Sequence, residues 1–133
     1  MVIGADTGFF LKRGERQARA LEIWSSILSG EDFLVVSVLT VAEFYAHQIQ
    51  RAKLAAAEEL ISQMQRVANI SIVPVSLEIA AASARYRRGM NLPTVDAVIF
   101  ATFLSMGCDV LVTTDSVFNQ ESVQNLIPVE LLA

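Results

Sequence analysis

Cysteine and long hydrophobic runs are both scarce in this chain of 133 residues. Cys108 is the only cysteine, which excludes an internal disulfide bond and indicates the reducing cytoplasm. The most apolar stretch, residues 97–106, is shorter than the roughly 20 residues that span a bilayer, and it lies too far inside the chain to be a signal peptide. The sequence therefore predicts a cytoplasmic protein that does not enter a membrane.

Charged residues make up only 18% of the chain, and the net charge is −4. A negative balance argues against a protein that binds nucleic acid by bulk electrostatics alone, although metal ions bound among carboxylates would offset it. The basic residues fall into two groups, which are either solvated helix faces or contacts for a polyanion. They are Lys12, Arg13, Arg16 and Arg19 in the first group, and Arg85, Arg87 and Arg88 in the second.

Repeats, low-complexity tracts and long linkers are absent, and the length fits one domain, residues 1–133, with a real core. Hydrophobic residues reach 53%, which is high for a soluble monomer. This surplus favours a homodimer face or a groove for a partner protein.

Short apolar runs alternate along the chain with segments of helical periodicity. The runs predict buried strands at residues 2–5, 33–38, 70–75 and 109–112, with a weak fifth at 127–129. The periodic segments predict helices at residues 15–28, 40–50, 53–68, 76–88 and 94–106, and Gly89 is expected to end the fourth. Asp6-Thr7-Gly8 is expected to form a turn. Strands that are apolar throughout indicate an α/β fold, a three-layer α/β/α sandwich with a central parallel sheet of four to five strands.

Four acidic residues lie at strand ends or helix starts: Asp6, Glu43, Asp96 and Asp115. In a parallel α/β fold these positions share one edge of the sheet, where ligands bind. Two ionised carboxylates about 5 Å apart repel by roughly 3 kcal/mol at an effective dielectric of about 20. A fold that gathers four of them must protonate some or bind a hard cation, and we favour the cation.

Each acid also has a local explanation that needs no chemistry. Asp6 and Asp115 suit a turn or a helix N-cap, and Glu43 completes a Thr-x-x-Glu capping box with Thr40. Asp96 is different because the helix that it begins is apolar almost all round. A carboxylate at the start of a buried helix is costly unless it is paired or bound to a metal. The hypothesis of a site therefore depends on the four side chains sharing one edge.

These acids lie within short motifs that together resemble a PIN domain, most closely the VapC-type toxin ribonucleases. The resemblance covers essentially the whole chain, with the motifs in the order that the family shows. The motifs are Asp6-Thr7-Gly8, Thr40-Val41-Ala42-Glu43, Leu92-Pro93-Thr94-Val95-Asp96-Ala97 and Thr113-Thr114-Asp115-Ser116-Val117-Phe118.

The resemblance implies an acidic pocket that binds Mg²⁺ or Mn²⁺ and hydrolyses phosphodiester bonds in RNA. It also implies a toxin that a small antitoxin protein holds inactive, while the RNA target is not encoded in any motif. The implied catalytic metal ligands, direct or through water, are Asp6, Glu43, Asp96 and Asp115. Thr7 and Thr113 would support these ligands, and Arg85 and Arg88 are candidates to hold the RNA backbone.

One position departs from the family pattern. Many PIN domains carry a further Asp or Asn just after the position of Asp115, where this chain has Val117 and Phe118. Asn119 is the candidate substitute, and otherwise a second metal is held more weakly, which leaves one metal at rest. His47, the only histidine, is expected at an ordinary half-buried position rather than in the site.

Two other interpretations fit an α/β fold with clustered aspartates. A catalytically weak or inactive PIN domain would bind RNA or a protein without cutting it. A phosphoacceptor receiver domain would need an acidic pair after the first strand and an aspartate at the end of the third. Asp6 stands alone and residues 73–75 are Val-Pro-Val, so we set the receiver domain aside.

Overall fold

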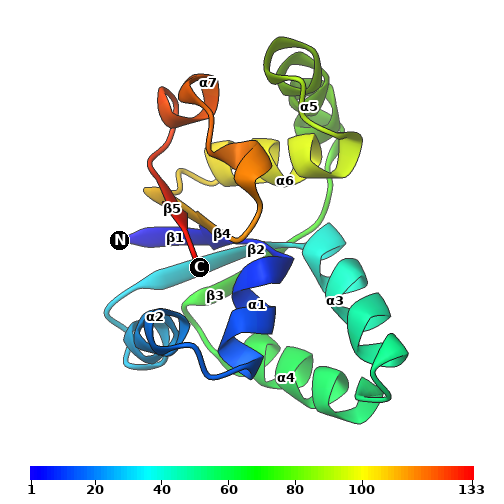
Figure 1. Ribbon diagram of the computed structural model, residues 1–133, viewed down its shortest axis with the longest axis vertical. Coiled ribbons are helices and arrows are strands. Elements are labelled where there is room, and N and C mark those ends of the chain that lie inside the picture. The colour runs from blue at the N-terminus through cyan, green and yellow to red at the C-terminus, as the bar shows by residue number, and fades with distance from the viewer.

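A parallel sheet with the strand order β3-β2-β1-β4-β5 lies at the centre of the computed structural model, which describes residues 1–133 (Figure 1). Its strands are β1 (Val2–Ala5), β2 (Phe33–Ser37), β3 (Ile70–Val73), β4 (Val110–Thr113) and β5 (Val129–Leu131). All of the strand pairs are parallel. The strand order reverses between β1 and β4, and ligands of such folds bind at the carboxyl ends of the strands beside this point.

Helices cover both faces of the sheet, which confirms the predicted α/β/α sandwich (Figure 1). Below the sheet in this view are α1 (Thr7–Gly14), α2 (Ala18–Leu28), α3 (Val38–Gln50) and α4 (Leu54–Arg66). Above it are α5 (Leu77–Met90), α6 (Thr94–Ser105) and α7 (Glu121–Gln124), with a 3-10 turn, η1 (Ser116–Phe118), before α7. None of these helices combines the length and the apolar character that crossing a bilayer requires.

Alternate side chains of the strands enter separate hydrophobic cores on the two faces. Leu34 and Val36 of β2 pack with α1, α2, α3 and α4, whereas Val35 between them packs with α6. Successive strand residues point to opposite faces, so a sheet buried on both sides needs apolar residues at every position. This explains the continuous apolar runs in the sequence.

Helix α6 forms the centre of the upper core. Every residue from Ala97 to Phe103 is buried, which confirms the expectation for a helix that is apolar almost all round. The ring of Phe103 packs against Gly4 of β1, where an added Cβ would lie 2.6 Å from Cγ of the ring. The missing side chain at Gly4 therefore lets α6 lie directly on β1.

The segment after β1 is a helix rather than the predicted turn. Asp6 caps the N-terminus of α1, and the buried side chains of Phe9 and Phe10 hold the helix against the sheet. The helix expected from residue 15 consequently begins later, at Ala18.

The start of α3 also differs from the expectation. The helix begins at Val38, because the hydroxyl of Ser37 accepts a hydrogen bond from the amide of Leu39 and caps it. Thr40 lies inside the first turn, where its hydroxyl is buried and caps nothing. The capping box between Thr40 and Glu43 is therefore wrong.

Two boundaries in the second half of the chain are shifted as well. Gly89 lies within α5, and the helix ends at Met90, because the C-cap residue Asn91 has a φ of 55°, the left-handed conformation that asparagine tolerates. The fifth strand exists but begins at Val129, because Ile127 is packed in the upper core instead of extending the sheet.

Candidate active site

Asp6 is held by hydrogen bonds from both sides of the strand-order reversal. Its Oδ1 accepts from the amide of Gly8 at 3.1 Å, which caps α1, and its Oδ2 accepts from the hydroxyl of Thr113 at 2.5 Å. The side chain is only 7% exposed. Burial raises the pKa of Asp6 to about 6, and the charge of Asp115 also raises it, while the hydrogen bonds from Thr113 and Gly8 oppose the shift. The N-cap expected for Asp6 is confirmed, and burial leaves the carboxylate costly to ionise.

Asp115 follows β4 and shares the hydroxyl of Thr113 with Asp6. The backbone amide of Asp115 donates to Thr113 Oγ1 at 2.9 Å, so this hydroxyl links the two acidic residues. Oδ1 of Asp115 accepts from the amide of Val117 at 3.0 Å and caps η1, as the sequence predicts. The side chain is exposed, which leaves its other oxygen accessible.

Glu43 reaches the same edge of the sheet from the second turn of α3. Its Oε1 accepts from the hydroxyl of Thr7 at 3.0 Å. Thr7 is the first residue of α1, so this bond ties the start of α1 to α3. The predicted supporting role of Thr7 therefore has a specific contact, although Glu43 itself is exposed.

Asp96 lies in the first turn of α6 and is half-buried. Burial is the largest cause that raises the pKa of Asp96 to about 6, and the charges of Asp115 and Glu43 raise it further. No side chain caps this helix, so the carboxylate lies beside free amides that favour a negative charge.

The structure brings the four predicted acids to one edge of the sheet. The negative charge of Asp115 raises the pKa of both Asp6 and Asp96, and the charge of Glu43 also raises the pKa of Asp96. None of the four acids forms an ion pair with Lys or Arg. In the side-chain orientations seen here, no three ligand-type groups converge on a single ion position. The donor set itself, oxygen-only and without a cationic partner, fits a hard divalent ion such as Mg²⁺ or Mn²⁺.

The other residues singled out from the sequence lie around this edge or away from it. Arg85 and Arg88 are exposed on α5, which ends just before the loop to Asp96. His47 is half-buried, as expected, and its Nδ1 has no hydrogen-bond partner. Oδ1 of Asn119 accepts from Nε2 of Gln124 at 2.8 Å, which gives this oxygen a partner outside the acidic site.

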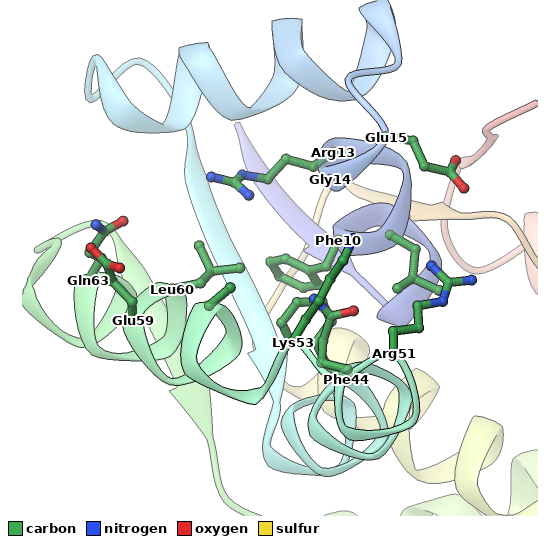
Figure 2. Close-up of a pocket in the computed structure, with 13 residues that line it drawn as sticks. Phe10, Arg13, Gly14, Glu15, Phe44, Arg51, Lys53, Glu59, Leu60 and Gln63 are labelled. Atoms are coloured by element: carbon green, nitrogen blue, oxygen red, sulfur yellow. The ribbon is translucent and has the colours of Figure 1, made fainter.

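A groove of about 360 Å³ opens between α1, α3 and α4 (Figure 2). Its lining combines an apolar surface with cations that form no ion pair within the protein. The apolar side chains include Phe10, Phe44 and Leu60, and the cations are Arg13, Arg51 and Lys53. Two acidic residues also line the groove: Glu15, which pairs with Lys12, and Glu59. The cations outnumber the acids, so in a protein with a net charge of −4 this groove is a local surface where apolar groups adjoin a small excess of positive charge.

Arg13 is the most constrained cation of this groove. Its guanidinium lies 4.6 Å from the ring centroid of Trp24, its Nε is buried without an acceptor, and burial lowers its pKa. In the sequence Arg13 belongs to a basic group with its neighbours, whereas Arg51 and Lys53 belong to neither of the two basic groups. Their only signal is a basic pair at a junction between two helices, which is common on protein surfaces.

The family model of the PIN domain matches residues 5–122. This chain belongs to the PIN domain family. The matched range extends from the end of β1 into α7 and contains all four acidic residues of the candidate site. Among curated protein sequences, none matches this PIN domain.

Solved structures that resemble this PIN domain come from several bacteria. A toxin-antitoxin complex from Klebsiella pneumoniae has a TM-score of 0.73 at 18% identity, with 96% of this chain and 95% of that chain covered. VapBC2 from Rickettsia felis, bound to a DNA fragment from its promoter, has a TM-score of 0.74 at 15% identity, with 98% of both chains covered. VapC20 of Mycobacterium tuberculosis, a sarcin-ricin loop cleaving toxin, has a TM-score of 0.65 at 19% identity, with 82% of this chain and 86% of that chain covered. At such identities these similarities establish the fold.

Proposed function

We propose that this PIN domain is a cytoplasmic endoribonuclease that requires Mg²⁺ or Mn²⁺ and hydrolyses phosphodiester bonds in RNA. The main support is the set of four carboxylates at one sheet edge, with the pKa values of Asp6 and Asp96 raised to about 6 and no cation paired with any of the four. A divalent cation favours the charged form of such groups and offsets their repulsion. The described activity of VapC20, which has a similar fold, is also RNA cleavage at the sarcin-ricin loop.

The four carboxylates would hold the metal, directly or through water. A metal bound there would supply an activated water and neutralise charge on the phosphate. Thr113 fixes the orientation of Asp6 relative to Asp115, whereas Glu43 and Asp115 are exposed and have room to turn towards an ion. Arg85 and Arg88 would bind the phosphates of the RNA backbone next to the reacting one.

The direct test is incubation of the purified protein with total RNA in the presence of Mg²⁺ or Mn²⁺, followed by mapping of the cut sites. Cleavage is expected with either metal and should disappear with a chelator and in the Asp96→Asn variant. Cleavage that survives both the chelator and this substitution would refute the metal-dependent mechanism.

A catalytically weak or inactive PIN domain that binds RNA or a protein is the second candidate. The observation that favours it is Phe118, which is fully buried near Asp115 where many PIN domains carry a further acidic or amide side chain. Calorimetry with Mn²⁺ separates the two functions. The binding module is supported if the protein binds RNA but takes up no Mn²⁺.

The protein is further proposed to be the toxin of a toxin–antitoxin pair. Similar folds occur in a toxin-antitoxin complex and in VapBC2, and the groove lined by Phe10, Phe44 and Leu60 offers a surface for a small antitoxin protein. Expression in bacteria is expected to arrest growth, and Asp96→Asn should remove the toxicity. Co-expression of a small protein encoded beside this gene should restore growth.

The groove variants Arg51→Glu and Lys53→Glu test where the antitoxin binds. Both side chains are exposed and lie outside the acidic site, so toxicity should be unchanged while the rescue weakens. Arg66→Glu, an exposed arginine of α4 that does not line this groove, is the matched control. Rescue of both groove variants at the wild-type level would place the antitoxin elsewhere.

A homodimer is proposed from the exposed apolar side chains near the candidate site. Leu77, the first residue of α5, is 90% exposed, and Val75 and Val95 are exposed as well. Sedimentation should give the mass of a dimer for the wild type and of a monomer for Leu77→Glu. A wild-type monomer at micromolar concentration would exclude this proposal.

A further inference from the structure

Gly8, in the first turn of α1, makes the tightest approach of any glycine in the protein. A Cβ added to Gly8 would lie 2.0 Å from Oγ1 of Thr114, 2.8 Å from its Cβ and 2.9 Å from its Cγ2. Thr114 stands between Thr113 and Asp115, just beyond β4. The start of α1 therefore contacts the residue that follows β4 at Gly8, where the absence of a side chain lets Thr114 approach the backbone.

Rotation of the Thr114 side chain would not make room for a methyl group at position 8. The hydroxyl and the methyl group of Thr114 move with χ1, but its Cβ is fixed by the backbone and would remain 2.8 Å from the added atom. Real Cβ atoms essentially never approach that closely, so the backbone of α1 or of residue 114 would have to move. Gly8 thus defines the distance between two backbone segments.

Both segments carry acidic residues of the candidate site. On the α1 side, Gly8 donates its amide to Asp6, and the neighbouring Thr7 donates its hydroxyl to Glu43. On the β4 side, Thr113 bonds both Asp6 and the amide of Asp115. A shift at the contact between Gly8 and Thr114 would therefore move Asp6, together with Thr7, the hydrogen-bond partner of Glu43, relative to Asp115.

We propose that Gly8 is a positioning residue, which acts through Thr114 to set the spacing of Asp6 from Asp115 for a divalent cation. This inference rests on the proposed function. An oxygen-ligated ion tolerates only small changes in ligand spacing, and Mg²⁺ is the most demanding because it requires near-ideal octahedral geometry. A methyl group at position 8 widens the site without removing any ligand.

The experiment measures Mn²⁺ binding by calorimetry for the wild type, Gly8→Ala, Thr114→Gly and the double variant Gly8→Ala/Thr114→Gly. Gly8→Ala should weaken Mn²⁺ binding by about 10–100-fold, the usual loss when a residue that orients metal ligands is changed. The double variant should regain the affinity of Thr114→Gly, because the obstructing side chain is gone. Gly14→Ala is the matched control, since it makes the same change in the same helix with no atom within 4 Å.

The outcomes separate this inference from the proposed function. A wild-type protein that binds no Mn²⁺ refutes the metal site and the positioning together. Wild-type binding with Gly8→Ala within twofold of it refutes the positioning alone. Should Gly8→Ala fail to fold, the double variant decides: folding and Mn²⁺ binding equal to Thr114→Gly support the inference. A double variant that does not fold, or folds without regaining affinity, overturns it.

Discussion

The hydroxyl of Thr113 donates a 2.5 Å hydrogen bond to Oδ2 of Asp6, which joins residues 107 positions apart in the chain. The same hydroxyl accepts the amide of Asp115. One buried side chain thus links the ends of β1 and β4 on either side of the strand-order reversal. The interaction lowers the pKa of Asp6 against the burial that raises it, so it favours the charged carboxylate that a metal requires.

Thr113→Val tests this role because valine keeps the shape of threonine and removes the hydroxyl. We expect Mn²⁺ affinity to fall by about 10-fold or more. The free energy of unfolding should fall by about 1–3 kcal/mol, since the acceptor of a buried hydrogen bond is left unpaired. Calorimetry and urea denaturation measure the two effects. Thr102→Val is the control, because its buried hydroxyl bonds only Val98 O within α6 and should leave Mn²⁺ binding intact.

The stability of the protein without added metal should decrease as the pH rises from about 4 to 6. Asp6 and Asp96 have pKa values near 6 in the folded state, against 3.8 for an ordinary aspartate. Between these values the folded state holds protons that the unfolded chain has released, so folding becomes less favourable as the pH increases. Above about pH 6 both carboxyl groups are ionised in the folded and the unfolded state, so they cause no further loss of stability as the pH rises.

Asp6→Asn isolates that effect from other titrating groups. Between pH 4 and pH 7 the stability of the variant relative to the wild type should rise by about 2–3 kcal/mol, because each pKa unit corresponds to about 1.4 kcal/mol and Asp6 is almost fully buried. Comparing the two pH values cancels the change in hydrogen bonding, since both oxygens of Asp6 accept hydrogen bonds and asparagine has one acceptor oxygen. Thermal unfolding across this pH range is the measurement, and a stability difference that is the same at pH 4 and pH 7 would contradict the raised pKa.

Much of the fold could be predicted because the apolar runs of the sequence mark the segments that are buried. The strands and the helix that contains Asp96 were located within a few residues, and the edge that they share was inferred from the connectivity of parallel sheets. Helix α1 was missed because it is short, and because Gly8 and Gly14 at its two ends suggest a turn. Its existence depends on the cap by Asp6 and on the burial of its aromatic residues, which is a tertiary effect.

The contacts that organise the site could not be predicted from sequence. Thr113 and Thr7 are marked in the sequence only by the family resemblance, and their contacts with Asp6 and Glu43 form only when the chain folds. The role of Ser37 in capping α3 was hidden because the residue also ends a strand and is buried there. Pairings between residues far apart in the chain depend on strand order, which local patterns do not encode.

Substitution by alanine should change the stability of the protein in opposite directions at Gly4 and Gly14. Gly4→Ala places a Cβ 2.6 Å from the ring of Phe103 and should destabilise the protein by about 1–3 kcal/mol through overpacking. Gly14→Ala meets no atom within 4 Å and should stabilise the helix by about 0.5–1 kcal/mol. Urea denaturation measures both, and the additional replacement Phe103→Leu should recover part of the loss in Gly4→Ala. Equal stabilities for the two glycine variants would show that α6 can move off β1 without cost.

Arg85 and Arg88 provide a test of how RNA reaches the acidic site. Both are exposed and belong to the same face of α5 at i and i+3 spacing, and neither forms an ion pair within the protein. Arg85→Glu/Arg88→Glu should raise KM for RNA with little change in kcat, because phosphate contacts position the substrate without taking part in bond cleavage. The slope of log KM against log salt should become shallower by about 1.4–2, which is about 0.7–1 for each of the two lost phosphate contacts. Arg66→Glu, which makes the same substitution at one exposed position of α4, should leave both kinetic constants unaltered. An unchanged salt dependence in the double variant would assign RNA binding to another surface.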